Sequence, residues 1–334
     1  MFESTDFHSL FRQFSNQKVL VIGDVMIDTY LWGMVGRVSP EAPVPIVSEI
    51  MNENRPGGAA NVALNVKAMG AVPILCSVIG GDERGRIFLE LMEEQNLSDI
   101  GLIVDDNRVT TQKTRVISGS QHLLRVDEEM DNFLSGRIQS QFLELINSLL
   151  ENGGIDAIIL QDYDKGVLAP GVISRVIETA AEASVPVLVD PKFRSFDLYR
   201  KVKLLKPNYK ELVHGLKLDL QKHQVDELAR AMILHQQKQE IDILLVTLSE
   251  QGIIVTRDGE SIHIPVISRE IADVSGAGDT VISVASLCLL AGLDAAATAV
   301  ISNLAGGQVC EKAGVVPVDA QKLLAECIQH FKSS

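Results

Sequence analysis

The segment Asp273-Val274-Ser275-Gly276-Ala277-Gly278-Asp279-Thr280 holds the residues best suited to chemistry, and the apolar run Val281–Leu290 follows it directly. Two glycines at the start of a helix leave backbone N–H groups open, so this turn can hold the charge on a phosphoryl group. Asp279 follows the glycines, where a carboxylate can accept the proton of an attacking hydroxyl. The pattern favours phosphoryl transfer to an alcohol. The alternative is a glycine turn in which Asp279 only compensates the helix dipole.

Other nucleotide-binding motifs are absent from the sequence. The third glycine of a dinucleotide fingerprint is replaced by Val281, and the turn comes late in the chain, which argues against nicotinamide binding. The sequence contains no G-x-x-x-x-G-K-[ST] string, which excludes P-loop kinases, and no H-R-D or D-F-G string, which excludes protein kinases.

Carboxylates and an amide follow the first apolar runs of the chain. Asp24 and Asp28 come directly after Lys18–Gly23, where a parallel sheet binds its ligands, and could accept hydrogen bonds from sugar hydroxyls. Gly57-Gly58-Ala59-Ala60-Asn61 opens the next helix, and its small residues would let Asn61 approach a substrate closely. The alternatives are turn or cap aspartates and close packing of the helix on the sheet, although packing does not explain Asn61.

Two later apolar runs are also followed by charged residues. Asp162 and Lys165 follow the first of them, and Lys192 and Arg194, together with Asp190, follow the second. Cations at strand ends in an acidic protein could hold a phosphorylated substrate or a nucleotide. Each one could equally be a solvated surface charge.

A polar pair and a hydroxyl-bearing turn follow the next runs. Asn208 and Glu211 are three residues apart on one face of a starting helix and could orient waters around Mg²⁺ and nucleotide phosphates. The same spacing also matches an ordinary capping box. The turn Thr247-Leu248-Ser249-Glu250-Gln251-Gly252 could meet the nucleotide or serve only as a hairpin turn.

Short apolar runs alternate with helical segments, which predicts an α/β protein with a doubly wound parallel sheet. Helices are predicted at 58–69 and 83–95, with Asp82 as an N-cap, and three more over 273–332. The predicted core strands are Lys18–Gly23, Val72–Val78, Ile155–Leu160, Val185–Val189, Leu204–Lys206 and Ile243–Thr247.

Two segments, at about 31–50 and 109–126, depart from this alternation of strands and helices, and each is predicted to form a pair of short strands. Inserts of this kind commonly cover an active site as a lid. The alternative is an extension of the edge of the main sheet. We expect one domain over 1–334 that carries these two lid insertions.

Composition excludes several classes of protein. With 30 basic and 44 acidic residues the net charge is −14, which disfavours binding to nucleic acid or to an anionic membrane surface. The four cysteines form no C-x-x-C pair, so neither a zinc site nor a disulfide framework is indicated, and reduced thiols in a cytoplasm fit best. Met1 to Ser15 lacks the pattern of an export signal, and no apolar stretch is long enough to span a bilayer.

Taken in order, these motifs resemble the PfkB or ribokinase family of sugar kinases. Gly57-Gly58-Ala59-Ala60-Asn61 is similar to the N-terminal signature of the family and Asp273 to Asp279 to its C-terminal signature, with Asn208-x-x-Glu211 between them. The resemblance implies a Rossmann-like, ribokinase-like fold with a small β-sheet lid, dimerisation through that lid, and the use of ATP with Mg²⁺. It leaves a requirement for a monovalent cation open. Ser275 departs from the usual threonine but keeps a hydroxyl.

Within the family, several strings look closest to the D-glycero-β-D-manno-heptose 7-phosphate kinases of ADP-heptose synthesis. The strings are Gly23-Asp24-Val25-Met26-Ile27-Asp28, Val38-Ser39-Pro40-Glu41-Ala42-Pro43-Val44-Pro45, Leu124-Arg125-Val126-Asp127 and Asp162-Tyr163-Asp164-Lys165-Gly166. The resemblance implies phosphorylation of the anomeric hydroxyl, with Asp279 as the base and the amides of Gly276, Ala277 and Gly278 around the phosphoryl group.

The same resemblance distributes the remaining residues between substrate and nucleotide. Those expected near the sugar or its phosphate are Asp24, Asp28, Gly57, Gly58, Asn61, Arg125, Asp162, Lys165, Lys192 and Arg194. Those expected near the nucleotide are Asn208, Thr247, Ser249, Gly252, Gly278 and Asn303, with Asn208 and Glu211 organising Mg²⁺ through water.

Kinases of this group often carry a second, nucleotidylyltransferase domain with a His-x-Gly-His motif. None of the seven histidines forms that motif, so no such domain is expected in this sequence. The alternatives are another sugar or sugar-phosphate kinase of the family, of the ribokinase or fructose-phosphate kinase type, and a non-catalytic sugar-binding protein with the same fold.

Overall fold

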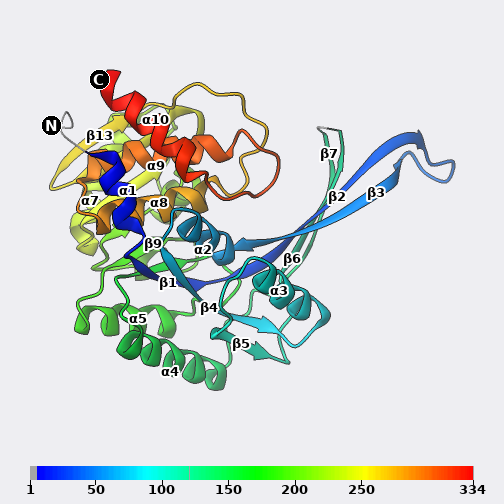
Figure 1. Ribbon diagram of the computed structural model, residues 1–334, viewed down its shortest axis with the longest axis horizontal. Coiled ribbons are helices and arrows are strands. Elements are labelled where there is room, and N and C mark those ends of the chain that lie inside the picture. The colour runs from blue at the N-terminus through cyan, green and yellow to red at the C-terminus, as the bar shows by residue number, and fades with distance from the viewer. Residues whose placement is uncertain (1–5, 120, 334) are drawn as a thin grey trace.

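The computed structural model describes residues 6–119 and 121–333 and contains a nine-stranded sheet between two layers of helices (Figure 1). All neighbours from β5 to β11 are parallel, whereas β11, β12 and β13 are antiparallel. In spatial order the strands are β13 (Glu260–Ile264), β12 (Ile253–Arg257), β11 (Ile243–Thr247), β10 (Leu204–Leu205), β9 (Val187–Asp190), β8 (Ala157–Gln161), β1 (Lys18–Gly23), β4 (Val72–Gly80) and β5 (Gly101–Asp105).

Alternate residues of the central strands enter two separate cores. In β1, Val19 and Val21 pack into one core while Leu20 and Ile22 pack into the other, because successive side chains of a strand point to opposite faces. The first core is covered by α1 (Phe7–Phe14), α2 (Ala59–Ala68), α3 (Glu83–Glu94), α8 (Ala277–Leu290), α9 (Ala295–Val309) and α10 (Ala320–Ser333). The second is covered by α4 (Gly136–Gly153), α5 (Pro170–Glu182), α6 (Tyr209–Gly215) and α7 (Val225–Gln239).

The predicted doubly wound α/β architecture is confirmed, and each of the six predicted core strands is present. Two of them, β1 and β11, have the predicted bounds. Asp82 caps α3 as predicted, and its side chain accepts a hydrogen bond from the Gly85 N–H at 2.8 Å. The three helices predicted for the C-terminal part are α8, α9 and α10. Strand β5 was not predicted, because its short apolar centre is flanked by turn residues.

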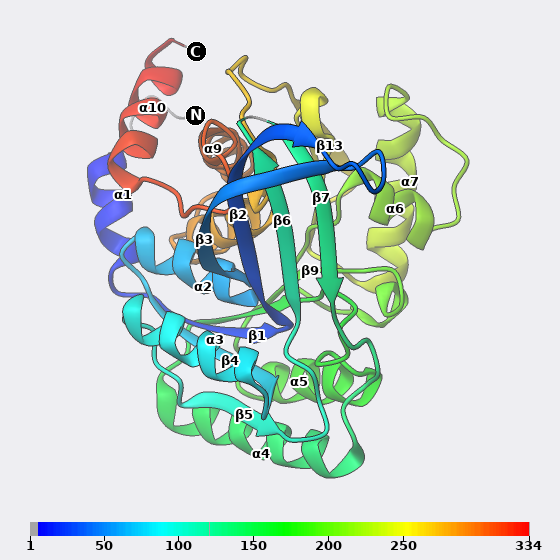
Figure 2. The same cartoon turned by 90° about the vertical axis from the view of Figure 1, so that its right-hand side faces the viewer.

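The lid is a separate sheet, as predicted, and not an extension of the main sheet. Its strands, in spatial order, are β3 (Pro45–Gly58), β2 (Val25–Val38), β6 (Gln112–Ser118) and β7 (Gln121–Glu128). The expected boundary near residue 31 was wrong, because β2 already starts at Val25, one residue after β1 ends. The sequence analysis interpreted Gly23–Asp28 as a ligand-binding turn after the first strand, whereas the first six residues of β2 are a buried part of the lid sheet. The sheet extends away from the helical layers (Figure 1), and its strands face the viewer in Figure 2.

Some sequence features concern the chain as a whole. All four cysteines are buried and unpaired. No helix within 6–119 or 121–333 is long and apolar enough to cross a membrane. Residues 1–5 of the N-terminal segment and residue 120 of the second lid insertion lie outside the described residues.

Candidate active site

Asp279 lies in the first turn of α8, directly after the glycine turn. Gly276 is the N-cap of this helix and has a φ of 80°, in the left-handed region that favours glycine. A Cβ at Gly276 would also lie 2.8 Å from the Asn61 amide nitrogen. The first N–H groups of a helix have no partner within the helix, so those of the Gly276-Ala277-Gly278 turn can bind an anion.

Three side chains donate hydrogen bonds to the buried Asp279 carboxylate. The Asn61 amide donates to Oδ2 at 2.7 Å, while the Tyr163 hydroxyl at 2.7 Å and the Gln161 amide at 3.1 Å donate to Oδ1. Burial raises the pKa of Asp279 to about 7, and the charge of Asp190 adds to this effect, while the bonds from Asn61 and Tyr163 oppose it. A carboxyl with this pKa can accept a proton near neutral pH.

The three partners of Asp279 come from α2, from β8 and from the loop after β8. Asn61 is in α2, Gln161 ends β8, and Tyr163 follows β8 by two residues. Gln161 Nε2 also donates to Asp190 at 3.2 Å, and Lys206 Nζ lies 3.0 Å from the same carboxylate oxygen of Asp190. The carboxyl ends of β8, β9 and β10 therefore meet under the start of α8, as expected for a ligand site in an open α/β sheet.

The sequence analysis missed Gln161, Tyr163 and Lys206. Each of them ends or follows a predicted strand, as the predicted residues do, but their types do not stand out. A lysine buried to 2% exposure beside Asp190 becomes notable only once the fold is known.

Asp28, which was expected in the turn after the first strand, lies in β2 at the base of the lid. Arg115 of β6 donates to Asp28 Oδ1 at 2.5 Å. A Cβ at Gly57 would lie 2.1 Å from Asp28 Oδ2, so glycine at position 57 is what leaves room for this carboxylate. Gly58 has a φ of 63° and links β3 to α2. The Gly57-Gly58 pair therefore places both Asp28 and the helix that carries Asn61.

Asp24 was expected to contact the sugar, but its carboxylate binds backbone amides of the protein. Its carboxylate accepts hydrogen bonds from the backbone N–H groups of Tyr163 at 2.9 Å, Lys165 at 3.1 Å and Val167 at 3.0 Å. The residue is only 1% exposed. Asp24 therefore holds the loop after β8, and through it the position of Tyr163.

The Asp24→Asn variant is expected to be less stable because an amide offers one acceptor oxygen where the carboxylate offers two. Loss of charge-assisted bonds to buried amides should lower the free energy of unfolding by about 2 to 3 kcal/mol. Urea denaturation of the variant and the wild type measures the difference. A variant with wild-type stability and a raised KM for sugar alone would instead favour direct contact of Asp24 with the substrate.

Asp162 is also engaged within the protein. Its carboxylate accepts the Tyr199 hydroxyl at 2.7 Å and the Asp164 N–H at 2.8 Å. Burial, with the charge of Asp24 as the second cause, raises the pKa of Asp162 to about 7. These contacts give Asp162 a structural role in the turn after β8.

Several cations gather at the lid base, each paired with a carboxylate. Lys165 Nζ lies 2.8 Å from Glu129, and Lys113 Nζ lies 2.8 Å from the same residue. Lys113 is also 3.1 Å from Asp127, which Arg125 contacts at 2.6 Å. The structure thus brings the predicted Arg125 and Lys165 into one cluster and adds Lys113. The sequence analysis missed Lys113 because the alternating pattern of the lid residues does not show which side chains pair across strands.

The other two predicted cations lie apart from this cluster. Arg194 donates to the Asp131 carbonyl at 2.6 Å and lies over the Phe133 ring. Lys192 pairs with Glu211, and its Nζ is 5.2 Å from the centre of the Tyr163 ring, which places it on the Asp279 side of the site.

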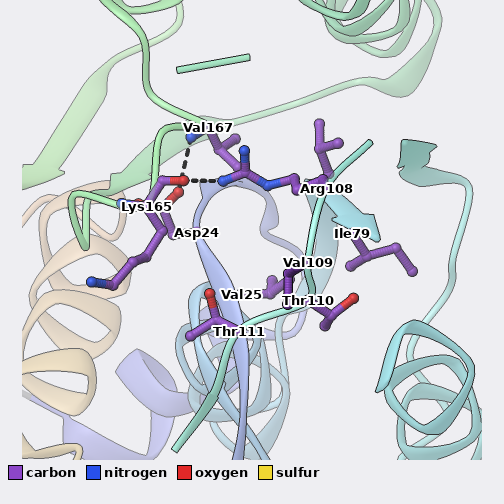
Figure 3. Close-up of a pocket in the computed structure, with 10 residues that line it drawn as sticks. Asp24, Val25, Ile79, Arg108, Val109, Thr110, Thr111, Lys165 and Val167 are labelled. Atoms are coloured by element: carbon purple, nitrogen blue, oxygen red, sulfur yellow. Dashed lines mark hydrogen bonds between the residues drawn. The ribbon is translucent and has the colours of Figure 1, made fainter. Parts of the chain in front are cut away.

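A cavity of about 10 Å³ lies beside Asp24, where the lid base meets the loop after β8 (Figure 3). Asp24, Arg108 and Lys165 line it together with threonine and aliphatic side chains, and the Arg108 guanidinium donates to the Lys165 carbonyl. This volume matches one water molecule and is too small for a sugar phosphate.

Asn208 and Glu211, which were predicted to lie near the nucleotide and Mg²⁺, form a capping box at the start of α6. Glu211 N–H donates to Asn208 Oδ1 at 2.9 Å, and Asn208 N–H donates to Glu211 Oε2 at 2.8 Å. Glu211 Oε1 pairs with Lys192. These oxygens are engaged, so direct ligation of Mg²⁺ does not fit, whereas the unused lone pairs fit contact through water.

The remaining residues predicted near the nucleotide lie in and directly after β11 and in α9. Ser249 and Gly252 are in the link between the antiparallel strands β11 and β12, so the turn is a hairpin connection. Thr247 ends β11 and bridges to Asn208. Asn303 of α9 donates to the Pro265 carbonyl at 3.0 Å. Thr247 and Asn208 are therefore adjacent, while Asn303 contacts the segment after β13.

A buried carboxylate at a glycine-rich helix start, above the carboxyl ends of a doubly wound sheet and beside a small lid sheet, defines a phosphotransferase of the ribokinase-like fold. Solved structures show the same fold. Phosphofructokinase-2 from Escherichia coli in complex with fructose-6-phosphate has a TM-score of 0.75 with 18% identity and covers 93% of this chain and 99% of its own. Ribokinase from Arabidopsis thaliana with ribose and ATP has a TM-score of 0.71 with 17% identity, covering 92% and 98%.

Residues 16–321 match the model of the pfkB family carbohydrate kinases, and the chain belongs to this family. It is therefore an ATP-dependent carbohydrate kinase. The "Bifunctional protein HldE" of Citrifermentans bemidjiense is 38% identical over 99% of this chain and 68% of its own length. The protein of that name from Helicobacter pylori is 39% identical over 89% of this chain and 64% of its own length. The chain thus spans about two thirds of these curated relatives.

Proposed function

We propose that the protein transfers the γ-phosphoryl group of ATP to the anomeric hydroxyl of D-glycero-β-D-manno-heptose 7-phosphate. The product is the 1,7-bisphosphate, a precursor in ADP-heptose synthesis for the lipopolysaccharide core. The observation that carries the reaction type is the Asp279 carboxylate, buried at the open start of α8 beside Asn61. The reaction is assigned to the cytoplasm.

In the proposed reaction, Asp279 accepts the proton of the sugar hydroxyl as the oxygen attacks the γ-phosphorus. The amides of the Gly276-Ala277-Gly278 turn stabilise charge on the transferred group, and ADP leaves with the electron pair of the broken bond. Asn61 positions the carboxylate through its 2.7 Å bond. Asp28 orients sugar hydroxyls at the lid base, and the lid excludes water.

Two observations support a phosphorylated heptose over a simple sugar. The cluster of Lys113, Arg125 and Lys165 provides cations near Asp28, and their carboxylate partners can be exchanged for a phosphate group. The similarity to the HldE proteins over nearly the whole chain agrees with the motifs that resemble heptose 7-phosphate kinases.

The nucleotide is assigned to the side of α6 and α8. Kinases of this family use ATP and typically Mg²⁺, which neutralises charge on the phosphates. Asn208 and Glu211 would hold the ion through water, and the assigned nucleotide contacts are Thr247, Ser249, Gly252, Gly278 and Asn303. A monovalent cation remains part of the proposal, since one solved neighbour is described in complex with potassium.

The partner proposed for the lid is a second copy of the chain. The lid exposes large apolar side chains, among them Met34 and Val38 at 63%, Met51 at 60% and Leu124 at 58%. Apolar side chains gathered on one small sheet favour its burial against another surface. This supports a homodimer joined through the lid.

The test of the proposed function is ³¹P NMR of the protein with ATP, Mg²⁺ and a panel of heptose 7-phosphate, fructose phosphates and ribose. We expect a new anomeric phosphate signal from heptose 7-phosphate alone. Product from another sugar would keep the kinase mechanism and overturn the substrate. Ligand binding with no product from any sugar would favour a non-catalytic sugar-binding protein.

A further inference from the structure

The Tyr163 hydroxyl donates to one of the two carboxylate oxygens of Asp279, the base of the proposed reaction. It donates to Oδ1 at 2.7 Å, and the Gln161 amide donates to the same oxygen at 3.1 Å. A carboxylate oxygen accepts about two hydrogen bonds, so Oδ1 is filled. Asn61 holds Oδ2 at 2.7 Å. An entering hydroxyl therefore meets a carboxylate that already has three donors.

Of these three donors, Tyr163 is the one that can be exchanged. Asn61 is fixed by Asn65, whose amide donates to Asn61 Oδ1 at 3.2 Å, and Gln161 also donates to Asp190. Asp24 holds the backbone of Tyr163, but the Tyr163 side chain is half-buried, and the one hydrogen bond of its hydroxyl in the described part of the chain is that to Asp279. Within the described residues, its hydroxyl is the only O–H donor to the Asp279 carboxylate, which makes it the chemical equivalent of a sugar hydroxyl.

We propose that Tyr163 is a positioning residue whose hydroxyl occupies the place of the sugar hydroxyl on Asp279 until substrate displaces it; this proposal rests on the proposed function. Without sugar, the phenol keeps water away from the base. The reaction it prevents is ATP hydrolysis, in which a water oxygen bonds to the γ-phosphorus, its proton passes to Asp279, and ADP departs with the electrons of the broken P–O bond. Tyr163 thus selects sugar over water as the acceptor.

The chemistry of the phenol fits this role. Burial, with the charge of Asp279 as the second cause, raises the pKa of Tyr163 well above its usual value, so the hydroxyl keeps its proton and remains a donor. Lys192 lies over the ring at 5.2 Å and contacts the face rather than the hydroxyl. Removing the hydroxyl alone therefore leaves the ring contact in place.

The test is the Tyr163→Phe variant, assayed for phosphate release with ATP and Mg²⁺ alone and for transfer with heptose 7-phosphate. We expect the rate of sugar-independent hydrolysis to rise about tenfold, because the loss of one charge-assisted hydrogen bond changes a rate or equilibrium by about this factor. The rate of transfer should stay within a few-fold of wild type. Tyr199→Phe is the matched control, since Tyr199 donates to the buried Asp162 at the same 2.7 Å. It should keep the wild-type ratio of hydrolysis to transfer.

A pH profile provides a second readout that a structural role would not change. The Tyr163 bond favours the ionised form of Asp279, so its loss should move the acid limb of kcat/KM upward by about one pH unit. Hydrolysis that stays at the wild-type level, or falls together with transfer, would overturn the placeholder role. An Asp279→Asn variant that retains transfer would overturn the proposed base itself, which separates the two failures.

Discussion

The Asp279→Asn variant is expected to bind ATP and sugar phosphate with near-normal affinity while its turnover falls at least about a hundredfold, because general base catalysis contributes this much or more. The amide has the size of the carboxylate but cannot accept the hydroxyl proton. Its NH₂ group would also face one of the donors Asn61 and Tyr163. Calorimetric titration measures binding, and coupled release of ADP measures turnover. Turnover near wild type would exclude Asp279 as the base.

The pH dependence of the wild type is the companion measurement. The ionised carboxylate is the active form, and burial raises the pKa of Asp279 to about 7. The value of kcat/KM should therefore be constant above this pH and fall tenfold per unit below it. A profile that stays flat down to pH 5 would contradict the buried base.

The Lys165→Met variant is expected to lose about 10- to 100-fold in kcat/KM for heptose 7-phosphate, which corresponds to one charge-assisted contact with the phosphate. The loss should be absent with unphosphorylated heptose, because only the phosphate would meet the ammonium group. Lys165 contacts Glu129 at 2.8 Å, and methionine keeps most of the side-chain length. Initial rates with the two sugars measure the difference.

Lys203→Met is the matched control for this experiment. Lys203 also pairs with a carboxylate, that of Asp242 at 2.5 Å, but it lies just before β10, at the end of the sheet opposite the site. It should leave both rates unchanged. Equal losses for the two sugars in Lys165→Met would mean that Lys165 acts on folding or on the lid, not on the phosphate.

The main sheet could be predicted because buried parallel strands leave nearly continuous apolar runs. The lid bounds could not, since Val25–Tyr30 is as buried as a core strand and begins with three apolar residues, although it belongs to the other sheet. Strand β13 carries no such run because it is mostly exposed, whereas β12 is apolar and buried at Ile253–Val255 and was nevertheless not predicted. Local pattern thus predicts burial better than it predicts which sheet a strand joins.

The candidate site shows the same limit. Asp279 and Asn61 could be predicted, since each lies in a signature at a helix start. The contact of Asp279 with Tyr163 joins residues 116 positions apart, and no local pattern carries it. Asp24 was predicted at the correct end of its strand, but its three amide partners become visible only when the loop after β8 is in place.

Two of the connections between the lid and the core are very short. Only Asp24 separates β1 from β2, and α2 begins directly after β3 at Gly58, with the Ala59 N–H donating to the Asp24 carbonyl at 2.9 Å. Such short connections cannot absorb a rotation of the lid, so a rotation of the lid is transmitted to the base of the active site. One connection leads through Asp24 to the loop of Tyr163, and the other leads through α2 to Asn61. Closure of the lid over a sugar would therefore displace both Asn61 and Tyr163, which donate to the two oxygens of the Asp279 carboxylate. Closure would in this way change the basicity of Asp279.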